Sequence, residues 1–253
     1  MDQSDIGARL SVIAQEASNL ILPLWRAGVA VDRKADESPV TEADRRAESL
    51  ILQRLAAEFP EIPIISEEDA SEFGTPDSIG PRFFLVDPLD GTKAFIRQDV
   101  HFTVNIALID NGMPIAGSVV APATGEMWRT APDGARKRTG DGAECAVRVR
   151  PRPADPVGLI SHTLKAEALQ GLKAQYGFDR TEAMDSSIKL CRIAEGAADL
   201  YPRHGTTMEW DIAAGHAVLL AAGGAVTTPE GGAFVYGKAD EGFRNGWFVA
   251  RGG

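Results

Sequence analysis

Apolar residues recur every three to four positions in two early stretches of the chain, and this spacing predicts two amphipathic helices. The first stretch covers residues 6–24. The second follows Thr41-Glu42-Ala43-Asp44, a sequence typical of a capped helix N-terminus, and it ends before Phe59-Pro60.

Short apolar runs separated by turn residues come next and predict strands. Asn111-Gly112 lies between two of these runs and indicates a tight hairpin turn. Thr124-Gly125 indicates a further turn into residues 126–129. We therefore expect two helices followed by a largely antiparallel meander, with its first strands at residues 62–66, 83–86, 102–109 and 114–121.

A proline-rich segment at residues 150–156 is the best candidate for a boundary. It divides the chain into an α+β half, residues 1–150, and an α/β half, residues 151–253. The second half alternates apolar runs of strand and helix length. Its expected elements are a strand at 157–161, helices at 164–176 and 187–195, a strand at 199–201, a helix at 212–222 and a strand at 225–228.

Composition narrows the classes of partner. The formal net charge of −10 argues against a nucleic acid polymer as partner, because such proteins normally carry a basic field. No stretch approaches the roughly 18 uninterrupted apolar residues of a membrane helix. Residues 1–5 lack the pattern of a secretory signal, and two cysteines are too few for a disulfide framework. We expect a cytoplasmic protein, with peripheral association at the inner membrane left open.

Three acidic clusters lie at the ends of apolar runs: Glu67-Glu68-Asp69, Asp87-Pro88-Leu89-Asp90 and Trp210-Asp211. Gathering carboxylates in one place is costly unless a cation joins them. Oxygen ligands alone suit a hard divalent ion such as Mg²⁺. If the clusters meet, the sequence predicts a magnesium site.

The middle cluster also carries features of an anion site. Pro88 stiffens the turn, and the Leu89 carbonyl adds an oxygen between the two aspartates. Gly91 permits close approach of the backbone, and Thr92 opens a short helix whose N-terminal amides can bind phosphate oxygens. Metal ligands and a phosphate cradle would then share one short segment.

Each cluster has a simpler explanation. The run at residues 67–69 is also typical of a solvated loop, Asp-x-x-Asp is common in turns, and Asp211 is positioned to cap its helix. In the second half, Ser186, Ser187 and Lys189 are candidates to contact a second phosphate or a ribose. A capping serine and a surface lysine explain that segment equally well.

Four segments together resemble the inositol monophosphatase-like superfamily. Asp87-Pro88-Leu89-Asp90-Gly91-Thr92 is similar to its D-P-[IL]-D-G-T signature, and Trp210-Asp211-Ile212-Ala213-Ala214-Gly215 to its W-D-x-A-A-G signature. Ser66-Glu67-Glu68 and the segment from Ser38 to Asp44 resemble two further motifs. All four stand in the family's order and spacing, over nearly the whole chain.

The resemblance implies a layered αβαβα sandwich of the inositol monophosphatase and fructose-1,6-bisphosphatase type, and a homodimer. It implies that two or three Mg²⁺ ions are held by Glu67, Asp87, the Leu89 carbonyl, Asp90 and Asp211. Thr92 and Glu67 would orient the attacking water, and Asp44 would support a further metal-bound water. The implied substrate contacts are Asp90, Gly91, Thr92, Ser186, Ser187, Lys189 and Asp211.

Within the superfamily, Lys93 and several second-half segments resemble the CysQ branch of 3'(2'),5'-bisphosphate nucleotidases. That branch implies lithium-sensitive, Mg²⁺-dependent hydrolysis of 3'-phosphoadenosine 5'-phosphate to AMP, linked to sulfate assimilation. Two departures leave the substrate open: Ala94 replaces an expected glutamate, and His162-Thr163-Leu164 replaces an expected Arg-Ser-His. Inositol 1-phosphate or another sugar phosphate is the alternative substrate. An inactive phosphate- or metal-binding scaffold is the alternative of another class.

Overall fold

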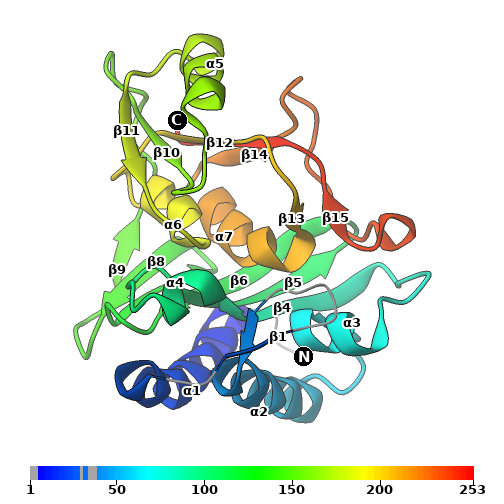
Figure 1. The fold of residues 1–253 in the computed structure, drawn as a ribbon. Coiled ribbons are helices and arrows are strands. Elements are labelled where there is room, and N and C mark those ends of the chain that lie inside the picture. Colours follow the sequence, from blue (N-terminus) through cyan, green and yellow to red (C-terminus); the bar gives the residue numbers. More distant parts are fainter. Residues whose placement is uncertain (1–4, 29–30, 34–38) are drawn as a thin grey trace.

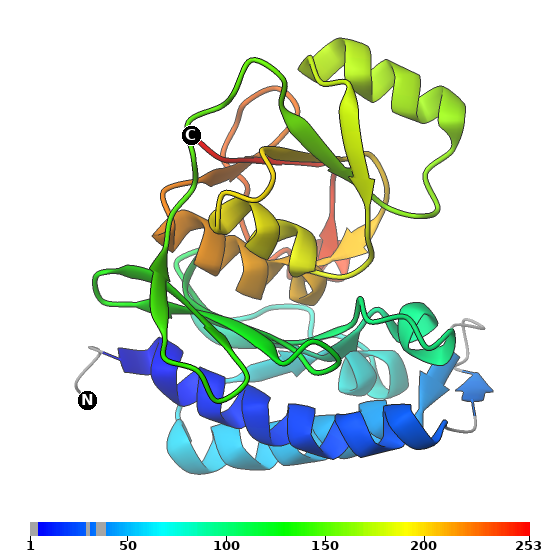
Figure 2. The same cartoon turned by 90° about the vertical axis from the view of Figure 1, so that its left-hand side faces the viewer.

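Two large sheets, one of seven strands and one of five, form the body of the protein. The computed structural model describes residues 5–28, 31–33 and 39–253. Ser38 of the family motif lies outside these residues. Figures 1 and 2 show the two sheets as separate layers, with helices between them and outside them.

The first layer consists of α1 (Ile6–Ala27) and α2 (Glu42–Glu58), which pack side by side on the outer face of the seven-stranded sheet. The sheet has the order β3-β4-β5-β6-β7-β8-β9, and only its β3–β4 pair is parallel. Its strands are β3 (Ile64–Ser66), β4 (Arg82–Asp90), β5 (Thr103–Asp110), β6 (Met113–Ala121), β7 (Glu126–Ala131), β8 (Gly134–Thr139) and β9 (Cys145–Val147).

Alternation along β4 explains why both faces of this sheet are covered. Phe84 and Val86 join the core beneath α1 and α2, whereas Phe83 and Leu85 join the core on the opposite face. Neighbouring strand residues point to opposite faces, so a strand that is apolar at every position needs a layer on each side. The second core contains α6 (Ile188–Ala194) and α7 (Glu209–Ala221), which separate the two sheets.

The five-stranded sheet has the order β11-β10-β12-β16-β14, with β10 parallel to both of its neighbours. Helix α5 (Ala166–Tyr176) lies outside it and completes an αβαβα sandwich, which confirms the predicted fold class (Figure 1). The strands are β10 (Val157–Ile160), β11 (Arg180–Ala183), β12 (Leu200–Arg203), β14 (Ala225–Thr227) and β16 (Phe248–Arg251).

The remaining elements are short. They are β1 (Val31–Arg33) paired with β2 (Pro39–Thr41), β13 (Thr207–Met208) paired with β15 (Arg244–Asn245), the 3-10 helix Ala239–Glu241, α3 (Glu67–Phe73) and α4 (Thr92–Ile96). None of the described helices has the length and apolar character needed to cross a membrane.

Most predicted elements are confirmed within a few residues of their expected ends. The Asn111-Gly112 hairpin is present, and both residues have the positive φ that such a turn requires. The acidic run at residues 67–69 opens a helix, so its alternative interpretation as a solvated loop is wrong. Strands β11 and β16 were not expected. The division at residues 150–156, between β9 and β10, stays a prediction.

Helix α7 approaches the seven-stranded sheet most closely at Gly117 on β6. A Cβ placed at Gly117 would lie 2.8 Å from the Ala214 carbonyl oxygen and 2.9 Å from the Ala217 Cβ. Real Cβ atoms almost never come that close to backbone, so a side chain here would push α7 away. The first turn of α7 carries Asp211, and the position of that carboxylate therefore depends on this glycine.

We expect Gly117→Ala to lower the free energy of unfolding by about 1–3 kcal/mol, the usual cost of overpacking. Gly171→Ala is the matched control, because Gly171 lies within α5 and nothing comes within 4 Å of its would-be Cβ. That substitution should be neutral or stabilising by up to about 1 kcal/mol. Urea denaturation of both variants measures the difference, and equal effects would contradict the close packing.

Candidate active site

A cavity of about 320 Å³ opens between the two halves of the molecule. The ends of β4 and β12 and the first turns of α3, α4 and α7 contribute to its lining. Eight of the predicted site residues line it: Glu67, Asp90, Gly91, Thr92, Ser186, Ser187, Lys189 and Asp211. Residues separated by more than 140 positions in the sequence thus meet at one cavity.

Four carboxylates converge on the floor of this cavity. Asp87 and Asp90 end β4, Glu67 is the first residue of α3, and Asp211 lies in the first turn of α7. Burial raises the pKa of Asp87 well above its ordinary value, and repulsion from Glu67 and Asp90 raises it further. The pKa of Asp211 is raised for the same reasons, burial first and then the charge of Asp90. These aspartates therefore tend to be protonated unless a bound cation stabilises their charged forms.

Asp90 connects the halves of the molecule. Its Oδ2 accepts a hydrogen bond from the Ser187 backbone N–H at 2.6 Å and one from the Asn105 side chain at 3.3 Å. Burial raises its pKa to about 6, although the positive charge of Lys189 acts in the opposite direction. The Ser187 hydroxyl donates to Asn105 at 3.1 Å, so all three groups form one network.

Asp44 and Thr92 meet above the same turn. Asp44 closes the predicted capping box of α2: its Oδ2 accepts from the Thr41 N–H at 2.8 Å and from the Thr41 hydroxyl at 2.6 Å. Its Oδ1 lies 3.3 Å from the Thr92 hydroxyl, which is also 3.2 Å from the Leu89 carbonyl oxygen. The Leu89 N–H in turn donates to Asp87 at 3.0 Å. The turn is therefore held from both sides.

Gly91 is the N-cap of α4 and has φ +93°, a conformation that favours glycine. A Cβ at this position would lie 2.8 Å from the His101 carbonyl oxygen. The tight β4–α4 connection consequently requires glycine. The predicted helix start at Thr92 is confirmed.

The structure decides whether Lys189 is a surface lysine and whether Asp211 caps its helix. Lys189 is 5% exposed, so its interpretation as a surface lysine is wrong. Its Nζ donates to the Ser186 carbonyl at 2.7 Å and to the Met184 carbonyl at 3.1 Å, and burial lowers its pKa to about 8. Asp211 does cap α7, because its Oδ2 accepts from the Met208 N–H at 2.8 Å. The same carboxylate faces Asp90 and Glu67, so capping and membership of the acidic group coexist.

Several residues of the cavity were not singled out by sequence reasoning. Arg97 lies one helical turn after Lys93, and Arg203 ends β12. The four-residue spacing from Lys93 would have placed Arg97 on the same side of α4. Nothing local in the sequence indicates the others, which are Asn105, Tyr201, Asp185 and Thr207.

The acidic group fits a hard divalent cation such as Mg²⁺. Its donors are all oxygens, and a bound cation would stabilise their charged forms against burial and mutual repulsion. Glu67, Asp87, the Leu89 carbonyl, Asp90 and Asp211 are the residues that would hold the ion. Glu48, which was not predicted, supports them: its Oε1 accepts from the Glu68 N–H at 3.0 Å and steadies the start of α3.

The raised pKa of Asp90 has a consequence for stability. A carboxyl with a pKa of about 6 in the folded protein and 3.8 as its reference value binds its proton more tightly when folded. Its contribution to the stability of the metal-free protein is complete below about pH 4 and is lost as the pH rises through 6. Asp90→Asn should remove this loss. Urea denaturation in EDTA at several pH values tests it: identical pH profiles for both proteins would contradict the shift.

The sequence and structure were compared with known proteins. The sequence matches the inositol monophosphatase family over residues 3–248. It is 43% identical over 216 residues to the 3'(2'),5'-bisphosphate nucleotidase CysQ of Escherichia coli O157:H7, covering 83% of this chain and 85% of that protein. The protein of the same name from Buchnera aphidicola is 37% identical over 245 residues, covering 96% of this chain and 92% of that protein.

A solved structure leads to the same family. The crystal structure of CysQ from Bacteroides thetaiotaomicron, a bacterial member of the inositol monophosphatase family, superposes with a TM-score of 0.80 at 32% identity. The match covers 99% of this chain and 98% of that one. An inositol monophosphatase from Thermotoga maritima has a TM-score of 0.77 at 24% identity, which supports the fold alone. The chain belongs to the inositol monophosphatase family of phosphatase enzymes.

Proposed function

We propose that the chain is a Mg²⁺-dependent 3'(2'),5'-bisphosphate nucleotidase that hydrolyses the 3'-phosphate of 3'-phosphoadenosine 5'-phosphate to AMP and phosphate. One observation carries the proposal: three carboxylates of the acidic group, from Glu67, Asp90 and Asp211, and four cationic side chains border the same cavity. The cations are Lys93, Arg97, Lys189 and Arg203. The relatives named CysQ support the same activity.

Magnesium at the carboxylate group would supply charge neutralisation for the phosphate dianion and lower the pKa of water at the site. Glu67, Asp87, the Leu89 carbonyl, Asp90 and Asp211 would hold two or three ions. The raised pKa values of the aspartates explain why the ions are required, since the charged forms of these groups repel one another.

Side chains and backbone amides around Thr92 would position the attacking water and the phosphoryl group. The Thr92 hydroxyl, fixed between Asp44 and the Leu89 carbonyl, orients the attacking water together with Glu67. Asp44 would support a further water. Its carboxylate is held in place, because its two oxygens accept hydrogen bonds from Thr41 and Thr92. The amides at Gly91 and Thr92, at the start of α4, bind phosphoryl oxygens as charge develops.

The cationic side of the cavity favours a substrate with a second phosphate. Lys189 has a pKa of about 8, so it is predominantly protonated at neutral pH. Inositol 1-phosphate carries a single phosphate, and that group is already accounted for by the carboxylate side. A second phosphate near Lys189 and Arg203 would neutralise these charges, with Ser186 and Ser187 lining the same wall.

The proposal extends to the location of the enzyme, its pathway and its oligomeric state. The enzyme acts on a small phosphorylated metabolite in the cytoplasm, its reaction is linked to sulfate assimilation, and it works as a homodimer. Inositol-1-phosphate hydrolysis and an inactive scaffold remain the alternatives for the experiment below to decide.

The substrate is tested by comparing kcat/KM for 3'-phosphoadenosine 5'-phosphate, inositol 1-phosphate and fructose 1,6-bisphosphate. Charge-assisted hydrogen bonds contribute about 1.5–3 kcal/mol each, so two contacts to the second phosphate predict a preference over inositol phosphate of at least about a hundredfold. Fructose 1,6-bisphosphate separates recognition of two phosphates from recognition of the nucleotide. All rates should vanish in EDTA and return with Mg²⁺.

A preference for inositol 1-phosphate would overturn the nucleotidase proposal but not the family. Absence of phosphate release from every substrate, with Mg²⁺ present, would favour the inactive scaffold. The same assay with added Li⁺ measures the lithium sensitivity that the resemblance implies.

The role of Asp87 is tested by Asp87→Asn. Loss of one carboxylate ligand should lower kcat by about a thousandfold or more, equivalent to about 4 kcal/mol. The metal-free fold should survive, because the variant removes a buried charge that its neighbours repel. Asp155→Asn is the matched control, since that side chain is 65% exposed and does not line the cavity. Asp87→Asn with activity near that of the control would contradict the assigned role.

A further inference from the structure

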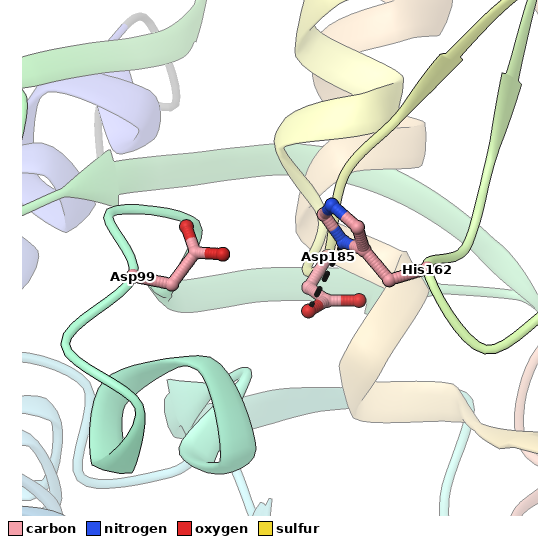
Figure 3. A group of neighbouring side chains, drawn as sticks. All are labelled: Asp99, His162 and Asp185. Carbon is pink, nitrogen blue, oxygen red and sulfur yellow. Dashed lines mark ion pairs between the residues drawn. The ribbon is translucent and has the colours of Figure 1, made fainter.

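Two aspartate–histidine pairs face each other beside the mouth of the cavity, one from each half of the molecule. Asp99 and His101 follow α4, while His162 follows β10 and Asp185 precedes α6. Figure 3 shows Asp99, His162 and Asp185 on three separate segments of the chain with their polar ends converging. One ligand atom from each of these three residues lies within 4.8 Å of the other two.

The distances within this group resemble those between ligands of one ion. His162 Nδ1 is 3.4 Å from Asp185 Oδ2, and His101 Nδ1 is 2.9 Å from Asp99 Oδ1. Ligands about 2.1 Å from a tetrahedral Zn²⁺ lie about 3.4 Å apart. The rings of His101 and His162 have their centroids 6.0 Å apart, so both histidines border the same space.

His101 provides a second, independent observation. Its Nδ1 is buried and makes no hydrogen bond of acceptable geometry among the described residues, although Asp99 is near. Buried polar atoms are normally satisfied, and a buried imidazole nitrogen without a hydrogen bond, beside the Asp99 carboxylate, is a group that a bound metal ion would satisfy.

We propose that Asp99, His162 and Asp185, with His101 as a fourth candidate ligand, bind a transition-metal ion of the Zn²⁺ class. Imidazole with carboxylate is a donor set that suits zinc and its neighbours, whereas Mg²⁺ prefers oxygen alone. The site shares no residue with the acidic group at Asp87.

Arg97 occupies part of this space. Its guanidinium lies 2.8 Å from Asp185 Oδ2 and supplies the positive charge that the ion would replace. The Arg97 side chain is 51% exposed, so it can turn away into solvent without unpacking the core. His162 is exposed as well and is free to rotate toward Asp99 and Asp185.

An ion at this position would join the two halves at the cavity mouth. Asp99 lies in the loop after α4, and α4 itself follows the turn proposed to bind phosphate. Asp185 lines the cavity. Binding would therefore fix the separation of these segments and release Arg97 from Asp185. A metal ion of a different class from the catalytic one would occupy a structural position beside the substrate.

The experiment is a calorimetric titration with Zn²⁺ alone as the ligand, in buffer containing saturating Mg²⁺ to occupy the acidic group. The wild-type chain is compared with His162→Ala and Asp99→Asn, and with His204→Ala as the matched histidine control. His204 hydrogen-bonds Tyr176 and stacks on Trp247, away from this group. Thermal unfolding in EDTA checks that each variant is folded.

We expect one Zn²⁺ site whose affinity falls at least about tenfold in His162→Ala and Asp99→Asn but not in His204→Ala. Crystals soaked with Zn²⁺ should show an anomalous peak among Asp99, His162 and Asp185. Unchanged Zn²⁺ affinity in both His162→Ala and Asp99→Asn overturns the proposal. So does an anomalous peak found only among Asp87, Asp90 and Asp211. Neither result bears on the nucleotidase activity, which is measured separately.

Discussion

Repulsion among buried carboxylates is the constraint on which the rest of the site depends. Asp87, Asp90 and Asp211 all have raised pKa values because they are withdrawn from water and face one another's charge. Such a group stays together only if other contacts hold it. Backbone N–H groups of Leu89, Ser187 and Met208 each donate to one of these aspartates. The fold thus positions the charges in advance, and the cation that the chemistry requires also relieves the repulsion.

The same contacts explain why the molecule has two sheets around one cavity. Asp87 and Asp90 belong to β4, Asp211 to a helix that packs between the sheets, and Ser187 to the second half. The close approach at Gly117 sets how near α7 can come to the first sheet. Neither half alone contains the acidic group. Packing of α7 therefore sets the position of Asp211 within the acidic group.

The sequence predicts the periodic elements and the motifs well, for identifiable reasons. Helices α1 and α2 have continuous apolar stripes, and Thr41 with Asp44 forms the expected capping box. Strands β11 and β16 lack an alternating pattern because tertiary contacts decide their burial. Lys189 was open to interpretation as a surface residue, since only the folded chain reveals its burial beside Asp90. Asn105 contacts Asp90 and Ser187, which are distant in the sequence, so local spacing cannot indicate it.

The cavity offers two different sets of possible metal ligands, one on its floor and one at its rim. The two sets differ because their local surroundings differ. The floor of the cavity offers oxygens alone, on buried aspartates held by backbone N–H groups. Its rim offers imidazole and carboxylate on exposed or half-buried side chains, one pair from each half. Hard cations prefer the first set of donors and borderline cations prefer the second, so the two proposed positions would select different ions. Arg97 then links the two, because the guanidinium that pairs with Asp185 at the rim also contributes to the cationic wall facing the substrate.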